Sequence, residues 1–148
     1  MLASHQVINA VAQALVDAAT DAGARVYTAR FHPVAVFPAI RVVHVDEDLQ
    51  ADADDITWPA SLSHALQLDV RALVRAPADL DDAMATMASQ ILAALGADAA
   101  PLSPLNVALQ PTGIRYQASA DGEAATGEAV VRFEANFTTQ ANAPDTIT

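Results

Sequence analysis

The 148-residue chain contains no cysteine and no lysine. Without cysteine it has no disulfide framework, no thiolate nucleophile and no cysteine-based zinc or iron–sulfur site. The chain has seven arginines, scattered along the sequence, and 18 aspartate and glutamate residues, which gives a formal net charge of −11. Cations this few and this dispersed do not neutralise phosphates, so we expect neither specific nucleic-acid binding nor attachment to an anionic membrane.

Long apolar runs are also absent. No stretch approaches the roughly 20 residues of a membrane helix, and the first residues lack the basic region and apolar block of a signal peptide. Hydrophobic residues nevertheless make up 53% of the chain, which together with its length is enough for a sizeable core. We therefore expect a soluble, cytoplasmic product that forms a single domain over residues 1–148, with its core spanning about residues 4–139.

Apolar residues at helical spacing predict two helices. The first covers residues 4–22, with Ser4 as its N-cap and Gly23 in the left-handed position after its end. The second begins at Asp79 and runs to residue 95. Asp81 and Asp82 lie in its first turn, where the helix dipole favours negative charge.

Alternating apolar and polar residues predict strands at residues 26–31, 39–46, 64–76, 114–119 and 129–139. Pro111-Thr112-Gly113 predicts a turn before the fourth strand. The order α-β-β-β-α-β-β predicts an α+β, two-layer sandwich: an antiparallel or mixed sheet of about five strands, with two helices packed on one face. Residues 46–63 are predicted to form an acidic loop, and residues 140–148 a polar, mobile tail.

Six acidic residues crowd into positions 46–55. No frame of this stretch places a glycine at the sixth position and a glutamate at the twelfth, as an EF-hand loop requires. We therefore expect no cofactor, although weak binding of a divalent cation by the acidic loop remains an alternative. Connections of this length commonly serve a function, so we expect the loop to act through the contacts it makes.

His44 and His64 stand at the two ends of the predicted loop, with Asp46 nearby. They form either a metal or pH-sensing site, or they are two ordinary histidines at strand ends. The second interpretation is by far the more common case for such spacing. The chain has no G-x-S-x-G nucleophile motif, no P-loop and no dinucleotide fingerprint. We therefore predict no catalytic residues and no enzymatic activity.

Six residues are candidates for contact with another subunit or a partner. Trp58 is the only tryptophan, and tryptophan is common at interface hot spots. Arginines on the polar face of the third strand are placed to meet acids of a neighbour, and the loop supplies such acids. The candidates are Asp52, Asp54, Asp55, Trp58, Arg71 and Arg75.

Several short segments, in a particular order, resemble a known family. They are the first helix, Phe37-Pro38-Ala39-Ile40 leading into a strand, the long polar loop, the strand at 64–76, the second helix, Thr112-Gly113-Ile114-Arg115-Tyr116 and the closing strand at 133–137. Together, over roughly residues 5–142, they resemble the tail terminator proteins of long-tailed phages, of the minor tail protein U type. Neck and head–tail joining proteins of related structure match nearly as well.

The resemblance implies a phage or prophage structural protein without catalysis. Such terminators form a ring, usually a hexamer, on the end of the tail tube, where they stop tube polymerisation and present a surface to the head connector. The partners implied are other copies of the chain, the tail tube protein and the connector, with DNA only passing through the lumen. The location implied is the tail or neck of the virion, and the host cytoplasm during assembly.

Two alternatives stay open. The chain is another neck or head–tail joining protein of similar fold, or a metal-dependent enzyme or small-ligand binder built on His44, His64 and the acidic loop. Within the terminator reading, residues 46–59 project either into the lumen, where they repel DNA, or toward a neighbouring subunit.

Overall fold

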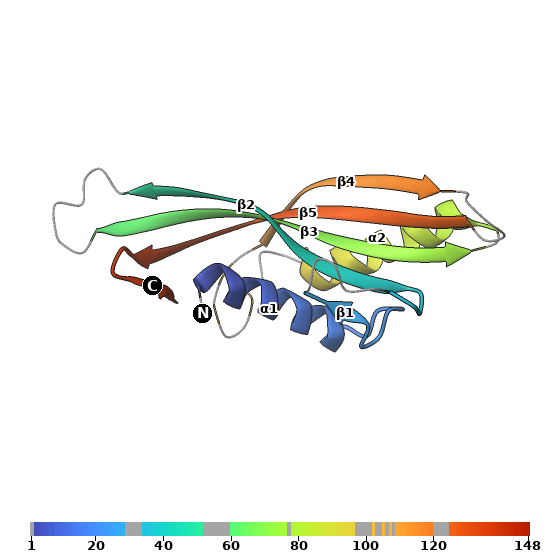
Figure 1. Ribbon diagram of the computed structural model, residues 1–148, viewed down its shortest axis with the longest axis horizontal. Coiled ribbons are helices and arrows are strands. Elements are labelled where there is room, and N and C mark those ends of the chain that lie inside the picture. The colour runs from blue at the N-terminus through green and yellow to red at the C-terminus, as the bar shows by residue number, and fades with distance from the viewer. Residues whose placement is uncertain are drawn as a thin grey trace.

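The computed structural model describes residues 2–28, 34–51, 60–76, 78–96, 109–119 and 125–148, together with Leu102, Leu105 and Val107. Figure 1 shows two helices packed along a long, twisted sheet. The elements in chain order are α1 (Ala3–Asp17), β1 (Val26–Tyr27), β2 (Ala39–Ala51), β3 (Ser61–Ala76), α2 (Leu80–Leu95), β4 (Leu109–Ser119), β5 (Ala125–Gln140) and β6 (Ala143–Ile147).

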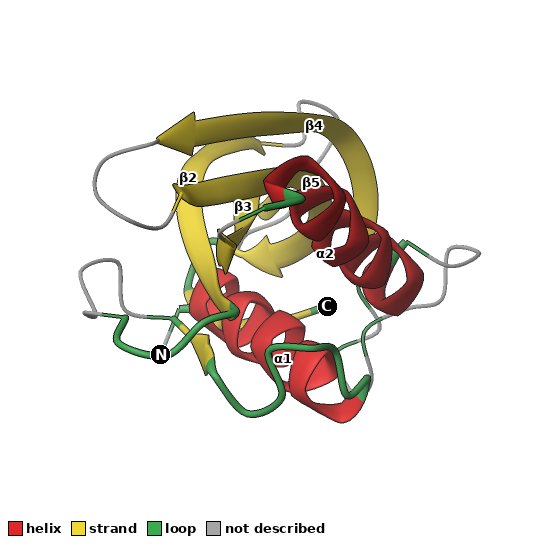
Figure 2. Ribbon diagram, turned by 90° about the vertical axis from the view of Figure 1, so that its right-hand side faces the viewer, coloured by secondary structure: helices red, strands yellow, loops and turns green. Residues whose placement is uncertain are grey.

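The strands form one six-stranded sheet in the order β1-β2-β3-β5-β4, with β6 pairing β5 beyond the end of β4. β1 runs parallel to β2, and the other pairs are antiparallel. Both helices lie on the same side of this sheet (Figure 2). The structure confirms the predicted α+β class and the two-layer arrangement.

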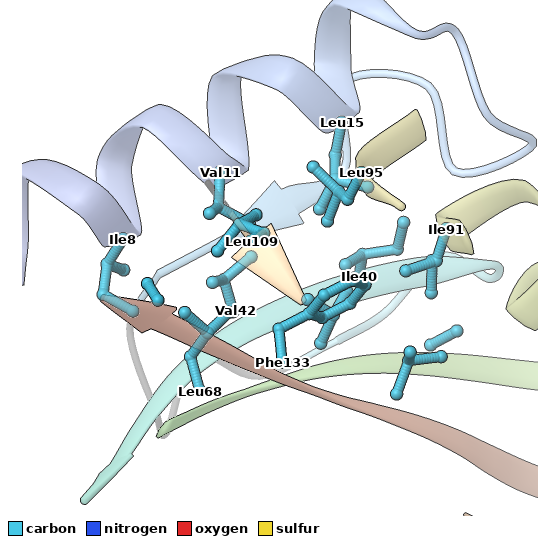
Figure 3. Close-up of a cluster of buried hydrophobic side chains, with 14 of the residues drawn as sticks. Ile8, Val11, Leu15, Ile40, Val42, Leu68, Ile91, Leu95, Leu109 and Phe133 are labelled. Atoms are coloured by element: carbon cyan, nitrogen blue, oxygen red, sulfur yellow. The ribbon is translucent and has the colours of Figure 1, made fainter. Parts of the chain in front are cut away.

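The core lies between the helices and the sheet. Each helix contributes one apolar stripe: Val7, Val11 and Leu15 from α1, Met87 and Ile91 from α2. Every second residue of the central strands points toward these stripes, as the pleat requires. Figure 3 shows the centre of this cluster around fully buried Phe133, with side chains from both helices, β2, β3 and β4 around it.

The opposite side of the sheet is here called the open face, and no helix of the described residues lies on it (Figure 2). Register places the alternate residues of the strands there. Its centre consists of Arg41, Val43, Asp69, Arg71, Val130 and Arg132.

The long connection between β2 and β3 is shorter than the predicted loop at 46–63. β2 continues to Ala51, and β3 begins at Ser61. The two strands pair down to Ala51 and Leu62, past the end of the helices, and form an arm made of residues 46–51 and 61–66 (Figure 1, left). Backbone pairing continues because every second residue pair of the ladder exchanges two hydrogen bonds whatever its side chains, so the acidic side chains of β2 do not end the strand.

A β-bulge between His44 and Asp46 changes the alternation of β2. His44 lies opposite Leu68 and Asp46 opposite Gln67, so Val45 is the extra residue. Beyond it Asp46 and Asp48 lie on the open face, whereas Leu49 lies on the helix side opposite His64. A one-residue bulge has this effect because the side-chain period of a strand is two.

Three further sequence predictions are wrong in detail. Pro111 and Gly113 do not form a turn but a second bulge inside β4, which is a continuous strand. Residues 140–148 are not an irregular tail, because β6 pairs with the end of β5 and partly buried Ile147 packs against the core. α1 ends at Asp17, five residues earlier than predicted, and the chain then turns through Ala19 and Gly23, both with positive φ.

The helix caps also differ from expectation. Leu2, not Ser4, occupies the N-cap of α1, and Ser4 is buried inside the helix. α2 begins directly after Asp79, which is its N-cap although its side chain makes no capping hydrogen bond, and Asp81 and Asp82 occupy the first turn as predicted. No helix among the described residues is long and apolar enough to cross a membrane.

Candidate functional site

Four of the six predicted contact residues lie in the segment 52–59, outside the described residues: Asp52, Asp54, Asp55 and Trp58. Their roles remain predictions. The other two, Arg71 and Arg75, lie on β3 and are described.

Arg71 is held by acids of its own chain. Its Nη1 donates to Glu128 Oε1 at 2.8 Å, and its Nη2 lies 3.5 Å from Asp69 Oδ2. A neighbour's carboxylate would therefore compete with two internal partners. Arg75 lies away from these acids, with its guanidinium 4.6 Å from the centre of the Phe37 ring, a distance at which cation–π attraction operates.

Asp69 is the centre of the open face. Its carboxylate accepts from Arg132 Nε at 2.9 Å and Arg132 Nη2 at 3.3 Å. The residue is fully buried although no helix covers it, because the arginine side chains lie over it. The hydrogen bond to Asp69, and then its charge, raise the pKa of Arg132. Sequence reasoning missed this pair, since an acid on the polar face of an alternating strand predicts exposure.

Arginines gather on this face despite the negative net charge. Register sets Arg41 beside Arg71, and Val130 beside both Arg71 and Arg115. Arg132 lies in the adjoining row with Asp69. A hollow of about 350 Å³ lies among Arg41, Val43, Val45, Asp69, Arg71, Glu128 and Arg132. Four of the seven arginines thus share one surface, and the acids that line the hollow among them are Asp69 and Glu128.

β4 is an exposed edge strand. Every residue from Gln110 to Ser119 is exposed, and no other strand of the described residues lies on the outer side of β4. Ile114 and Tyr116, on its helix side, are 46% and 47% exposed, and Arg115 on its open side has no acidic partner among the described residues. An edge strand of this length, with unpaired backbone groups on its outer side and exposed apolar side chains, is a typical site at which another strand pairs.

β2 is the outer strand on the other side. The short strand β1 pairs only with Ile40 and Arg41, so within the described part of the chain the outer edge of residues 42–51 has no strand beside it. In the arm, Asp46 and Asp48 are exposed on the open side, and Leu49 is 59% exposed on the helix side. The two free edges of the sheet therefore differ: one is acidic, the other carries an arginine.

His44 and His64 come together at the base of the arm, but through Glu47 and not Asp46. His64 Nδ1 lies 2.8 Å from Glu47 Oε1, and His44 Nε2 lies 3.3 Å from Glu47 Oε2. His64 Nε2 lies 2.7 Å from Thr139 Oγ1, and its ring stacks on Phe137 at 4.6 Å. Burial alone raises the pKa of Glu47, but hydrogen bonds from His64, His44 and Ser4 outweigh it, and the pKa is lowered.

This polar cluster ties α1, β2, β3 and β5 together at the point where the arm leaves the helices. Within the described residues, no group of three or more histidine, aspartate or glutamate side chains is placed to hold a metal ion. The weak divalent site predicted for the acidic loop stays a prediction, because Asp52, Asp54 and Asp55 of that loop lie outside the described residues. Glu47, His64 and Thr139 in this cluster each have a hydrogen-bond partner, as buried polar groups generally do.

No protein-family model matches the chain, and no curated protein matches it either. Among solved structures, a chain of the virion of a native gene transfer agent (GTA) particle has the same fold. The TM-score is 0.54 at 17% sequence identity, and the match covers 90% of this chain and 97% of that chain. At this identity the likeness shows a shared fold, spanning nearly the whole of both chains.

Proposed function

We propose that this chain is a non-enzymatic structural protein of a phage or phage-like particle, and specifically a tail terminator. The observation that carries the proposal is the fold, which matches a chain of a gene transfer agent virion over nearly its whole length. The short segments quoted above, which resemble terminators of the minor tail protein U type, support the finer assignment.

The two free sheet edges suit a ring-forming subunit. A closed ring needs a heterologous interface, in which two different patches on each copy meet. β4 and the arm of β2 are such patches, because they lie on opposite sides of the sheet and differ in charge. The ring proposed here is a hexamer, the usual number for the terminators that the chain resembles.

In this role the partners are the tail tube protein on one side of the ring and the head–tail connector on the other. DNA passes through the lumen without specific binding, since a subunit with a net charge of −11 repels the phosphate backbone. The protein acts in the tail or neck of the virion and assembles in the host cytoplasm.

The proposal is tested by adding the purified chain to the tail tube protein of the same particle while tubes polymerise. A terminator shortens the tubes in proportion to the amount added, and electron microscopy shows a ring on one end only. Tubes of unchanged length with bare ends would refute the assignment.

The same experiment distinguishes the terminator from the second candidate, a neck or head-completion protein. The fold match supports both candidates equally, because the matched chain is described only as part of a virion. A neck or head-completion protein leaves tube length unchanged but co-purifies with the portal-side connector. Binding to the connector without any effect on the tubes would therefore transfer the proposal to the neck.

A further inference from the structure

The free edges of the sheet have matching directions. β2 and β5 each run antiparallel to β3, so they run the same way, and β4 runs antiparallel to β5. β4 is therefore antiparallel to β2. If the strands run roughly along the ring axis, a second copy rotated about that axis keeps its strand directions, so its β2 meets the first copy's β4 in antiparallel orientation, the pattern of most of the sheet.

The side chains of these edges match on both sides of the sheet. On the open side β4 presents Arg115, and the arm presents Asp46 and Asp48. On the helix side β4 presents Ile114 and Tyr116, and the arm presents Leu49. An opposite-charge pair and an aliphatic pair are the cross-strand contacts that stabilise an antiparallel ladder.

We propose that β4 of one copy pairs with the arm of β2 in the next copy, with Asp48 opposite Arg115 and Leu49 opposite Ile114. This inference rests on the proposed ring function and names the interface that closes the ring. One antiparallel register satisfies both pairs together, because 48 with 115 and 49 with 114 have the same sum. The same register places Asp46 opposite Gln117.

Charge also selects the arm over the inner part of β2. Arg41 shares the open face and would lie against Arg115 in a register shifted inward, where like charges opposite each other destabilise pairing. β1 moreover covers the outer edge of β2 at Ile40 and Arg41. Among the described residues of β2, those beyond the bulge combine an outer edge with no described strand beside it, acidic residues on the open side and an exposed leucine on the helix side.

The absence of cysteine in the chain makes the register directly testable. The full-length double variant Asp48→Cys/Arg115→Cys contains the only two thiols, and opposite residues of an antiparallel pair are close enough for a disulfide. Within one copy two strands separate β2 from β4, at about 4.8 Å per strand step, so an internal bridge cannot form. Mild oxidation is expected to give a ladder of covalent oligomers on non-reducing gels, ending at the closed ring.

Matched controls fix the register. Gln50→Cys/Arg115→Cys shifts one thiol by two residues along the same strand and face, and is expected to cross-link at least about tenfold more slowly. Asp48→Cys and Arg115→Cys alone are expected to stay monomeric on the gel, because a head-to-tail contact never brings two copies of one position together. Dimers from a single variant, equal rates in the shifted pair, or no ladder at all would overturn the inference.

Charge exchange gives an independent readout on the cysteine-free protein. Arg115→Asp and Asp48→Arg are each expected to weaken self-association roughly tenfold, measured by light scattering over a concentration series at low salt. The double variant Arg115→Asp/Asp48→Arg is expected to recover most of the loss. Loss without recovery, together with loss of binding to a DNA duplex, would assign the arginines to nucleic acid and overturn the inference.

The outcome is separable from that of the proposed function. If wild-type protein caps tubes but the cysteine pair gives no ladder, the terminator assignment stands and this interface is wrong. If the ladder forms but tubes elongate unchanged, the interface stands and the chain forms a ring elsewhere in the particle.

Discussion

Replacing Asp69 tests the account of the open face most directly. The carboxylate is 1% exposed and accepts from Arg132 at 2.9 and 3.3 Å, with Arg71 at 3.5 Å. Breaking a buried ion pair by removing one partner costs about 3–5 kcal/mol, because the remaining charge is left unpaired. Here the arginines are 33% and 39% exposed and can turn to water, and Arg71 keeps Glu128. We therefore expect Asp69→Asn to destabilise the fold by about 2 kcal/mol and Asp69→Ala by about 3 kcal/mol.

Urea denaturation of the purified variants measures these differences. Glu128→Gln is the matched control, since it removes the other, more exposed acid of the same cluster and is expected to cost at most about 1 kcal/mol. In the double variant Asp69→Asn/Arg132→Gln neither charge is left behind, so its cost is expected to be clearly below the sum of the single costs. A cost below about 0.5 kcal/mol for Asp69→Asn, or full additivity, would refute the view that Arg132 and Asp69 depend on each other.

Three further predictions follow from other parts of the molecule. The pKa of Glu47 is lower in the folded protein than the unfolded pKa of about 4.5, so its carboxylate contributes stability above that pH. This contribution is lost as the pH falls through the folded pKa. The free energy of unfolding, measured from pH 7 to pH 3, should therefore fall less steeply in Glu47→Gln than in wild type. Gly127→Ala places a methyl group 2.6 Å from Met84 Sδ and 3.2 Å from Leu80 Cδ1. It should lower the free energy of unfolding, measured by thermal denaturation, by about 1–3 kcal/mol. Gly113→Ala, with open space around the added carbon, should lower it clearly less. The triple variant Asp52→Asn/Asp54→Asn/Asp55→Asn should change ring assembly, seen by light scattering with and without Mg²⁺, if the acidic loop contacts a neighbour; unchanged assembly of the folded variant would leave only the lumen role for these acids.

The fold class could be predicted from the sequence because its signals are local. The alternation in β3 and the apolar stripes of α1 and α2 depend on neighbours a few residues apart, and each appears in the structure where the pattern placed it. Strand ends were harder to predict. The ladder with β3 carries β2 through an acidic stretch that favours a loop by composition, and pairing with β5 orders the C-terminal tail.

The side-chain contacts of the candidate site were harder to predict from the sequence than the fold class. In a regular strand Asp46 would lie with Ile40, Val42 and His44 on the helix side, and nothing in the local sequence marks Val45 as an extra residue. The partnership of Asp69 with Arg132 joins positions 63 residues apart and depends on the register of β3 against β5. The meeting of His44 and His64 was expected from the pairing of their strands, but the carboxylate between them is Glu47, which only the bulge turns to that side.

The two bulges have a consequence for the proposed ring. One precedes the arm, between His44 and Asp46, and the other lies in β4 between Pro111 and Gly113. A bulge bends its strand and increases the local twist, so both strands of the proposed contact carry a fixed bend close to it. If copies join through these strands in a ring, as proposed above, the two bends contribute to the angle between neighbouring subunits and therefore to the number of copies that close the circle.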